Sequence, residues 1–327
     1  MIVALSGGVG GARLAAGLAR VLPPEQLLVV VNDGDDFDHW GLRVCPDLDT
    51  VMYTLAGRVD ESQGWGLADE RWTVLEAVAA AGGESWFRLG DRDLGTHVVR
   101  TEALRAGRTL SEVTAELARR FGVAHRIVPS TDDRHRTIVH TDAGALEFQD
   151  YFVRRRCAPV LERVSFDSAA PGGGPARPSP AFAAAIAGDG VDAVVICPSN
   201  PVLSVQPLLA LDGVRAWLAS RRFPVVAVSP FIGGRAVKGP AAKIFGELGL
   251  EPSVDALAQW YDGLVDAWLV DDADRDALPA LRARGLHARA CDTLLNDDGR
   301  RREVAHVLCD WIRELPPPPP HDPGRPR

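Results

Sequence analysis

The start of the chain alternates between apolar runs and a helical pattern, which predicts a strand, a helix and a second strand. Residues 2–5 are continuously apolar, and residues 12–21 place apolar side chains at helical spacing. Residues 26–31, QLLVVV, form an unbroken apolar run, typical of a parallel strand that is buried on both faces. A strand, helix and parallel strand form a βαβ unit, whose crossover is almost always right-handed.

The same alternation returns in the second half of the chain. Apolar strand patterns begin at residues 192, 224 and 267, and helical patterns cover 181–187, 214–223, 255–265 and 302–314. Between the two halves, we expect a helix at 110–121, a short strand at 125–129 and a hairpin that turns at 142–144. The pattern predicts an α/β fold over residues 1–315, with a Rossmann-like, doubly wound, mostly parallel sheet. An inserted mixed α/β segment is expected at about 50–165.

Two segments have compositions that oppose regular structure. Residues 168–180, SAAPGGGPARPSP, are rich in proline and glycine, which predicts an exposed loop. Residues 316–327 have the sequence PPPPPHDPGRPR, which consists mostly of proline and charged residues. We expect this tail to be disordered and without a chemical role.

Composition narrows the class of protein. The chain has 327 residues, 46% of them hydrophobic, and a formal net charge of −8, which argues against general binding to nucleic acids or anionic membranes. The five cysteines are scattered without a CxxC pair, so we expect no disulfide framework or zinc site. No apolar run reaches membrane-spanning length, and no secretory leader is expected. These features predict a cytoplasmic protein.

The glycine-rich loop between the first strand and helix is a candidate phosphate site. Its sequence, SGGVGGARL, is neither GxGxxG in register nor a P-loop. Glycines let the backbone approach an anion, and amides at a helix start donate to it. The candidate residues for phosphate or nucleotide binding are Ser6, Gly7, Gly8, Gly10 and Gly11. A tight turn that needs only small residues is the structural alternative.

Carboxylates follow the second strand and precede the next helical stretch. The segment NDGDDF at 32–37 suits a hydroxylated ligand, a metal or a solvated turn. Asp47 and Asp49 stand two residues apart, directly before an apolar stretch. Asp49 is a candidate N-cap of a helix at 50–56, and Asp47 and Asp49 together are candidate magnesium ligands.

The densest polar stretch is WFRLGDRDLGTHVVRT, residues 86–101. Paired acids and arginines on a surface explain such a cluster and contribute little to stability. A glycine inside the cluster favours a loop shaped around an anionic ligand instead. Its polar residues are Arg88, Asp91, Arg92, Asp93, His97 and Arg100.

Two later strands end in polar, glycine- or proline-rich loops, CPSNP and SPFIGGRAVKGPAAK. Open α/β sheets bind ligands at the carboxyl ends of their strands. We therefore expect a second phosphate or base pocket that involves Ser199, Asn200, Gly233 and Lys238.

Taken together and in order, these motifs resemble the 2-phospho-L-lactate transferase family. The motifs are SGGVGGARL, VVVNDGDDF, PDLDTVMY, LGDRDLGTH, PSNPVLS, SPFIGGRAVKGPAAK and CDTLLND, and the resemblance spans residues 1–312. It implies a Rossmann-like core, a homodimer, a magnesium requirement and a role in making coenzyme F-420. It also implies transfer of a phospholactyl, phosphoenolpyruvyl or phosphoglyceryl group from a guanosine-linked donor to the deazaflavin FO, with release of GMP.

The resemblance also implies roles for individual residues. Asp49 and Arg88 match the FO-binding positions of the family. Asp49, with Asp47 or Asp35, would hold magnesium, and Asp49 or Asp91 would orient or deprotonate the attacking hydroxyl. Arg88, Arg92 and Lys238 are then candidate ligands of the phosphate or carboxylate. A nucleotide-sugar-binding regulator of the same superfamily, without enzymatic activity, is the alternative function.

Overall fold

The computed structural model describes residues 1–170, 172–237, 239–316 and 318. The predicted disordered tail at 316–327 falls almost entirely outside these residues and stays a prediction. No helix within the described ranges combines the length and the apolar composition needed to cross a bilayer.

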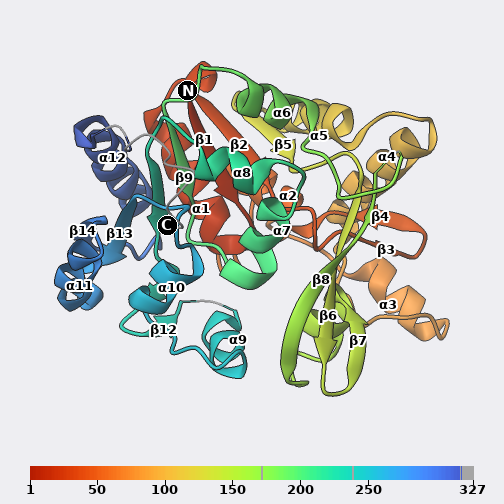
Figure 1. Ribbon diagram of the computed structural model, residues 1–327. Helices are drawn as coiled ribbons and strands as arrows, with labels where there is room; N and C mark the ends of the chain where they lie inside the picture. Colours follow the sequence, from red (N-terminus) through yellow and green to blue (C-terminus); the bar gives the residue numbers. More distant parts are fainter. Residues whose placement is uncertain (171, 238, 317, 319–327) are drawn as a thin grey trace.

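A seven-stranded sheet runs through the middle of the molecule in the order β14-β13-β10-β9-β1-β2-β5 (Figure 1). Every pairing in it is parallel, which confirms the predicted Rossmann-like α/β fold. The edge strand β14, HARAC, is absent from the sequence prediction because it lacks the apolar run of the central strands. The strands are β1 (Ile2–Ser6), β2 (Leu27–Val31), β5 (Arg126–Pro129), β9 (Ala193–Ile196), β10 (Val225–Val228), β13 (Ala267–Asp271) and β14 (His287–Cys291).

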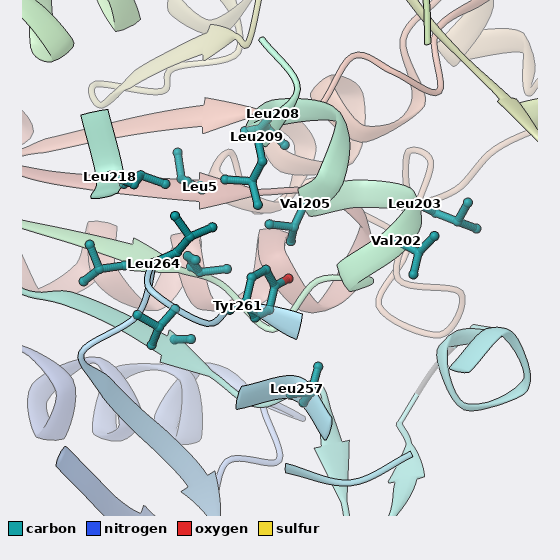
Figure 2. Packing of buried hydrophobic residues seen from close by; sticks show 14 of the residues in the cluster. Leu5, Val202, Leu203, Val205, Leu208, Leu209, Leu218, Leu257, Tyr261 and Leu264 are labelled. Atoms are coloured by element: carbon teal, nitrogen blue, oxygen red, sulfur yellow. The ribbon is translucent and has the colours of Figure 1, made fainter. Parts of the chain in front are cut away.

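Alternate residues of these strands face two separate cores, one on each side of the sheet. In β1, Val3 and Leu5 belong to one core, and Ile2 and Ala4 belong to the other. Figure 2 shows part of the first core, where Leu208 and Leu209 pack over the strand that carries Leu5. Burial on both faces explains why the central strands are continuously apolar.

Helices cover both cores, so the sheet is doubly wound as predicted. The second core is covered by α1 (Gly8–Val21), α2 (Pro46–Leu55), α5 (Leu110–Arg120) and α12 (Asp298–Glu314). The first is covered by α6 (Pro180–Ala187), α7 (Gln206–Leu209), α8 (Val214–Ala219), α9 (Ala241–Glu247), α10 (Val254–Trp260) and α11 (Leu278–Ala283). Short helices complete the fold: η1 (Pro24–Gln26), η2 (Asp150–Arg154), η3 (Pro201–Val205) and η4 (Asp272–Ala277).

The order of the strands places a topological switch point between β1 and β9. From β1 the chain proceeds outward through β2 to β5, then returns to β9 on the other side of β1. The loops after β1 and β9 therefore leave in opposite directions and open a crevice at the carboxyl end of the sheet.

The material outside the main sheet is less extensive than the expected 50–165 segment. Within that range, β5 is a strand of the main sheet, and α5 packs on the second core. What remains in that range is a pair of helices and an antiparallel sheet in the order β7-β6-β8 that projects from the body in Figure 1, while a small hairpin of β3 and β4 precedes the range. These elements are β3 (Phe37–His39), β4 (Leu42–Val44), α3 (Thr73–Ala80), α4 (Asp91–Arg105), β6 (Arg134–Thr141), β7 (Gly144–Glu147) and β8 (Leu161–Ala169). A second small hairpin joins β11 (Phe231–Ile232) to β12 (Arg235–Ala236).

The predicted exposed loop at 168–180 is correct only in part. Its first two residues belong to β8, where Ala169 pairs with Arg134 of β6. Near its end, Ala176 and Ser179 are buried, and the amide of Ser179 donates to Ser130 O at 2.8 Å. Pairing with β6 and packing against the sheet override the composition of these residues.

The contact between α1 and α12 predicts a stability effect at Gly17. A Cβ at Gly17 would lie 2.2 Å from the backbone oxygen of Arg301, which cannot rotate away. We expect Gly17→Ala to lower the free energy of unfolding by roughly 1–3 kcal/mol, measured by urea denaturation. Gly95→Ala in α4 is the matched control, because no described atom lies within 4 Å of a Cβ built there. The control should be neutral or stabilising. Equal stability of the two variants would contradict the close helix contact.

Candidate active site

The start of α1 lies against the loop that follows β9, at the switch point. The amide of Gly7 donates to Ser199 Oγ at 3.1 Å. A Cβ at Gly10 would lie 2.3 Å from Pro198 O, and one at Gly11 would lie 2.6 Å from Ser199 Oγ. These glycines are needed because the helix approaches the neighbouring loop too closely for any side chain. Packing thus accounts for much of the glycine-rich motif.

A cavity of about 690 Å³ opens at this edge of the sheet. Its wall includes the loops after β1, β9 and β10, the start of α2, and the face of α4. Aromatic side chains line another part of it: Tyr53, Trp65, Trp86, Phe87, Phe148 and Phe152. A deep cavity of this size, with polar groups on one side and aromatic groups on another, is typical of a small-molecule site.

The carboxylate of Asp47 occupies the position that the sequence assigned to a phosphate. Asp47 is buried in the first turn of α2, and it accepts hydrogen bonds from the Gly8 amide and from Asn32 Nδ2, the latter at 2.9 Å. Burial raises the pKa of Asp47 to about 6. The amide of Gly8 therefore contacts a protein carboxylate instead of being free for an anion.

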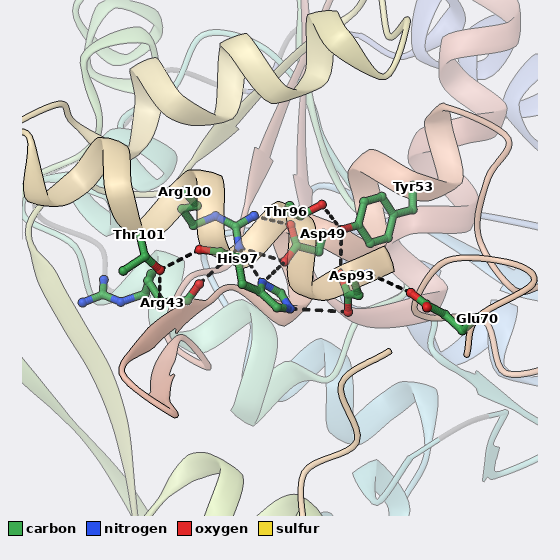
Figure 3. Close-up of polar contacts among 9 residues, drawn as sticks. All are labelled: Arg43, Asp49, Tyr53, Glu70, Asp93, Thr96, His97, Arg100 and Thr101. Atoms are coloured by element: carbon green, nitrogen blue, oxygen red, sulfur yellow. Dashed lines mark hydrogen bonds and ion pairs between the residues drawn. The ribbon is translucent and has the colours of Figure 1, made fainter. Parts of the chain in front are cut away.

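Asp49 lies at the centre of a buried polar network (Figure 3). Arg100 of α4 donates through both terminal nitrogens to Asp49, with Nη1 at 3.0 Å from Oδ2. His97 Nδ1 lies 3.7 Å from the same oxygen. Burial raises the pKa of Asp49, and the positive charge of Arg100 offsets only part of this effect. The fork of Arg100 fixes the orientation of the Asp49 carboxylate, which lines the cavity.

Asp93 completes the network from the first turn of α4. The hydroxyl of Tyr53 donates to Asp93 Oδ1 at 2.7 Å, and His97 Nε2 lies 3.4 Å from Oδ2. Burial alone would raise the pKa of Asp93, but hydrogen bonding to His97 and Tyr53 lowers it overall. Asp93 is therefore an ionised carboxylate that faces the cavity at neutral pH.

Several predicted site residues do line the cavity. Asp47 and Asp49 reach it from the first turn of α2, and Arg88 reaches it from the loop before α4; the predicted loop residues that also line it are Gly7, Gly8, Gly10, Ser199 and Asn200. Asn200 also has a structural task, since its Oδ1 accepts from the amides of Val202 and Leu203, both at 3.0 Å. The structure therefore brings together the glycine-rich loop, the pair Asp47 and Asp49, and the loop after β9.

Other predicted residues do not reach the cavity. Asp91 is absent from the cavity lining, and its carboxylate accepts from the amides of Thr73 and Val74 at the start of α3, so it is a helix cap rather than a catalytic candidate. Arg92 donates to Ala68 O at 3.1 Å outside the cavity wall.

Three more predicted loop residues serve hydrogen bonding or packing within the fold. The amide of Gly233 donates to Asp274 Oδ2 at 2.9 Å. Ser6 and Gly11 lie behind the loop in the contact with Ser199. Lys238 lies outside the described residues.

The predicted N-cap role of Asp49 is also wrong. The helix starts four positions earlier than expected, at Pro46, because proline is favoured in a first turn. Asp49 therefore lies inside the first turn, where its side chain points to α4 instead of capping α2.

Sequence reasoning assigned no role to Arg13, Tyr53 or the aromatic residues of the cavity, and none specifically to Asp93 or His97. One usable signal was present: Asp93, His97 and Arg100 follow one another at spacings of four and three, which places them on one face of a helix. The aromatic residues have no such signal, because they come from segments far apart in sequence.

The buried pair of Asp49 and Arg100 predicts a large stability effect. Arg100→Met leaves the Asp49 carboxylate buried without its cation, and we expect a loss of about 3–5 kcal/mol in the free energy of unfolding. The double variant Asp49→Asn, Arg100→Met should recover part of this loss in urea denaturation, because no charge remains unpaired. Strictly additive effects of the two substitutions would contradict the pairing.

Comparisons with known proteins agree with this geometry. A sequence model of the family 2-phospho-L-lactate transferase CofD matches residues 2–309. The phosphoenolpyruvate transferase of Kitasatospora aureofaciens is 44% identical over 95% of this chain and 98% of its own. That of Streptomyces coelicolor is 42% identical over 96% of this chain and 99% of its own.

Solved structures show the same fold at lower sequence similarity. A crystal structure of a UPF0052 family protein from Bacillus halodurans superimposes with a TM-score of 0.60 and 15% identity, over 94% of this chain and 98% of that one. The full-length family match and the close relatives are decisive for the classification. The chain therefore belongs to the CofD family of 2-phospho-L-lactate transferases, in keeping with a transferase of coenzyme F-420 biosynthesis.

Proposed function

We propose that the protein transfers a phosphoenolpyruvyl group from a guanosine-diphospho-linked donor to the terminal ribityl hydroxyl of FO, with GMP as the leaving group. The relatives named phosphoenolpyruvate transferases support this donor over its phospholactyl and phosphoglyceryl counterparts. The observation that carries the proposal is the pair of buried carboxylates, Asp49 and Asp93, held on one side of a large cavity at the switch point.

The aromatic part of the cavity supports a planar acceptor. Phe148 and Phe152 are nearly parallel to each other, with ring centroids 5.3 Å apart, and both line the cavity. On another segment, the Arg88 guanidinium lies 4.2 Å from the centre of the Trp72 ring. A deazaflavin ring system buried against such side chains gains apolar and stacking contacts.

The two carboxylates supply what the attack of a hydroxyl on phosphorus needs. In the reaction, the bond from the hydroxyl oxygen to phosphorus forms, and the bond from phosphorus to the GMP phosphate oxygen breaks. An ionised carboxylate that accepts a hydrogen bond from the hydroxyl orients it and receives its proton. Asp93 is ionised, and Asp49 is fixed by Arg100, so either carboxylate suits this role. Phosphoryl transfer depends mainly on such alignment and on neutralising charge.

Asp35 and Asp47 fit the magnesium ion that the family resemblance implies. Asn32 Nδ2 donates to Asp35 Oδ1 at 3.2 Å and to Asp47 Oδ2 at 2.9 Å, and both carboxylates line the cavity. Burial and the charge of Asp47 raise the pKa of Asp35, so a cation bound between the two carboxylates would be favourable. Hard oxygen donors are the ligands that magnesium prefers.

Asp49 fits the ion less well than the sequence suggested. One of its oxygens lies within 4.8 Å of ligand atoms of Asp93 and His97. However, Arg100 already donates to both oxygens of Asp49, and its positive charge would repel a dication. We propose that Asp47 and Asp35 hold magnesium, which when bound would neutralise charge on the donor phosphates.

The proposed reaction is tested with FO and the three guanosine-linked donors in parallel. We expect release of GMP and a product heavier by one phosphoenolpyruvyl group, with that donor reacting fastest and with no turnover in EDTA. Chromatography and mass spectrometry measure both products. Tight binding of a uridine nucleotide-sugar without any transfer to FO would overturn the proposal in favour of a nucleotide-sugar sensor.

A matched pair of aspartates tests the catalytic assignment. We expect Asp93→Asn to lower kcat by at least about 100-fold, since it removes a positioned proton acceptor. Asp91→Asn, two residues away, should keep kcat within a few-fold of the wild type, because that carboxylate caps α3 outside the cavity. Steady-state rates of GMP release measure both. An equal loss in the two variants would place the effect in the structure of α4 instead of in catalysis.

A further inference from the structure

Arg13 is a cation that lines the cavity. It extends from α1 on the same side as Val9, four residues earlier, and it is half-buried. Across the described ranges, its guanidinium makes no hydrogen bond or ion pair with the chain. A partly desolvated charge without a counter-ion is unfavourable, so this arrangement points to a ligand.

A second arginine makes the electrostatic potential around Arg13 more positive. Arg301 of α12 lies close enough to affect it, and burial together with the charge of Arg301 lowers the pKa of Arg13. Glu61, whose negative charge acts favourably on Arg13, is already bound by Arg301, with Nη1 and Nη2 at 2.9 Å and 2.6 Å from its two oxygens. Glu61 is therefore shared with a second arginine and does not neutralise Arg13 fully.

The other arginines in or near the cavity are engaged or placed differently. Arg100, behind the cavity wall, binds Asp49 through both terminal nitrogens, and Arg88 is exposed over the Trp72 ring. Arg156 is exposed and follows the segment that carries Phe148 and Phe152. Among these arginines, Arg13 belongs to α1, the helix that begins at the switch point. Gly10, one turn earlier on the same helix, also lines the cavity.

The acids of the cavity restrict where an anion binds. Asp35, Asp47, Asp49 and Asp93 line it, and all four are largely buried. Two phosphates and a carboxylate of the proposed donor must avoid these oxygens or reach them through a cation. Arg13 provides a positive position at the rim of this acidic region, on the helix that starts at the switch point.

We propose that Arg13 binds the phosphate of the leaving nucleotide. The identity of this nucleotide as a guanosine phosphate rests on the proposed function, whereas the binding of a phosphate anion does not. In the free protein the charge of Arg301 acts unfavourably on that of Arg13, and a bound phosphate would offset this repulsion with a charge-assisted hydrogen bond. Arg13 thus selects anionic ligands for the end of the cavity next to α1.

The test measures binding of inorganic pyrophosphate and of GDP by isothermal titration calorimetry. We expect Arg13→Gln to weaken both by about 10- to 100-fold, because a bond between two charged groups is lost. Arg13→Lys should restore part of the affinity. The control is Arg20→Gln, farther along α1, where Arg20 is exposed and pairs with Asp298 at 3.2 Å; its affinities should equal those of the wild type.

Thermal unfolding without ligand separates binding from folding. Arg13→Gln should leave Tm unchanged or raise it, because the substitution removes a charge that is repelled by Arg301. A marked fall in Tm would show instead that Arg13 stabilises the fold, and would overturn the inference.

The outcomes also separate this inference from the proposed function. Unchanged pyrophosphate affinity in Arg13→Gln, or no pyrophosphate binding by the wild type, overturns the role of Arg13 even if transfer to FO occurs. Binding that depends on Arg13, without guanosine preference and without transfer to FO, supports the anion site and overturns the proposed reaction.

Discussion

The close approach of α1 to the loop after β9 is the contact on which the site depends. At Gly10 a side chain would meet the backbone oxygen of Pro198 at 2.3 Å, so the two segments pack backbone against backbone. Gly7 and Ser199 join them by a hydrogen bond of 3.1 Å. Because β1 and β9 lie at the switch point, this contact fixes the crevice where loops from both halves of the sheet meet. The glycine-rich motif thus shapes the cavity before it contacts any ligand.

Buried carboxylates give the cavity its second constraint. Asp33 is satisfied within the fold, since it accepts from the Ser130 hydroxyl and the Thr131 amide and so joins the ends of β2 and β5. Asp49 is satisfied by Arg100. The side-chain amide of Asn32 donates to both Asp35 and Asp47, Asp47 also accepts from the Gly8 amide, and burial raises the pKa of both carboxyls. Asp33 and Asp49 thus hold the site together, whereas Asp35 and Asp47 line the cavity.

The orientation of α4 decides which of its polar side chains meet the carboxylates of α2. Glu70 accepts from the amides of Arg92 and Asp93 at 2.9 Å and 2.7 Å, while Asp91 accepts from the amides at the start of α3. This reciprocal capping fixes the first turn of α4 and directs Asp93, His97 and Arg100 toward α2 (Figure 3). Asp91 and Asp93 are indistinguishable as residue types in the sequence. Their different roles follow from a contact with a segment about twenty residues earlier.

The sequence by itself determined the parallel sheet, because buried strands must be apolar on both faces and this pattern is visible along the chain. It also determined the order of the polar loops, and hence the family resemblance, since these loops follow strand ends. Only the tertiary structure decided which polar residues meet. The pairing of Asp49 with Arg100 joins residues 51 positions apart, and the contact of Gly7 with Ser199 joins residues 192 apart. The aromatic wall and the place of Arg13 in the cavity depend equally on contacts between distant segments, because burial and charge balance are properties of the folded cavity.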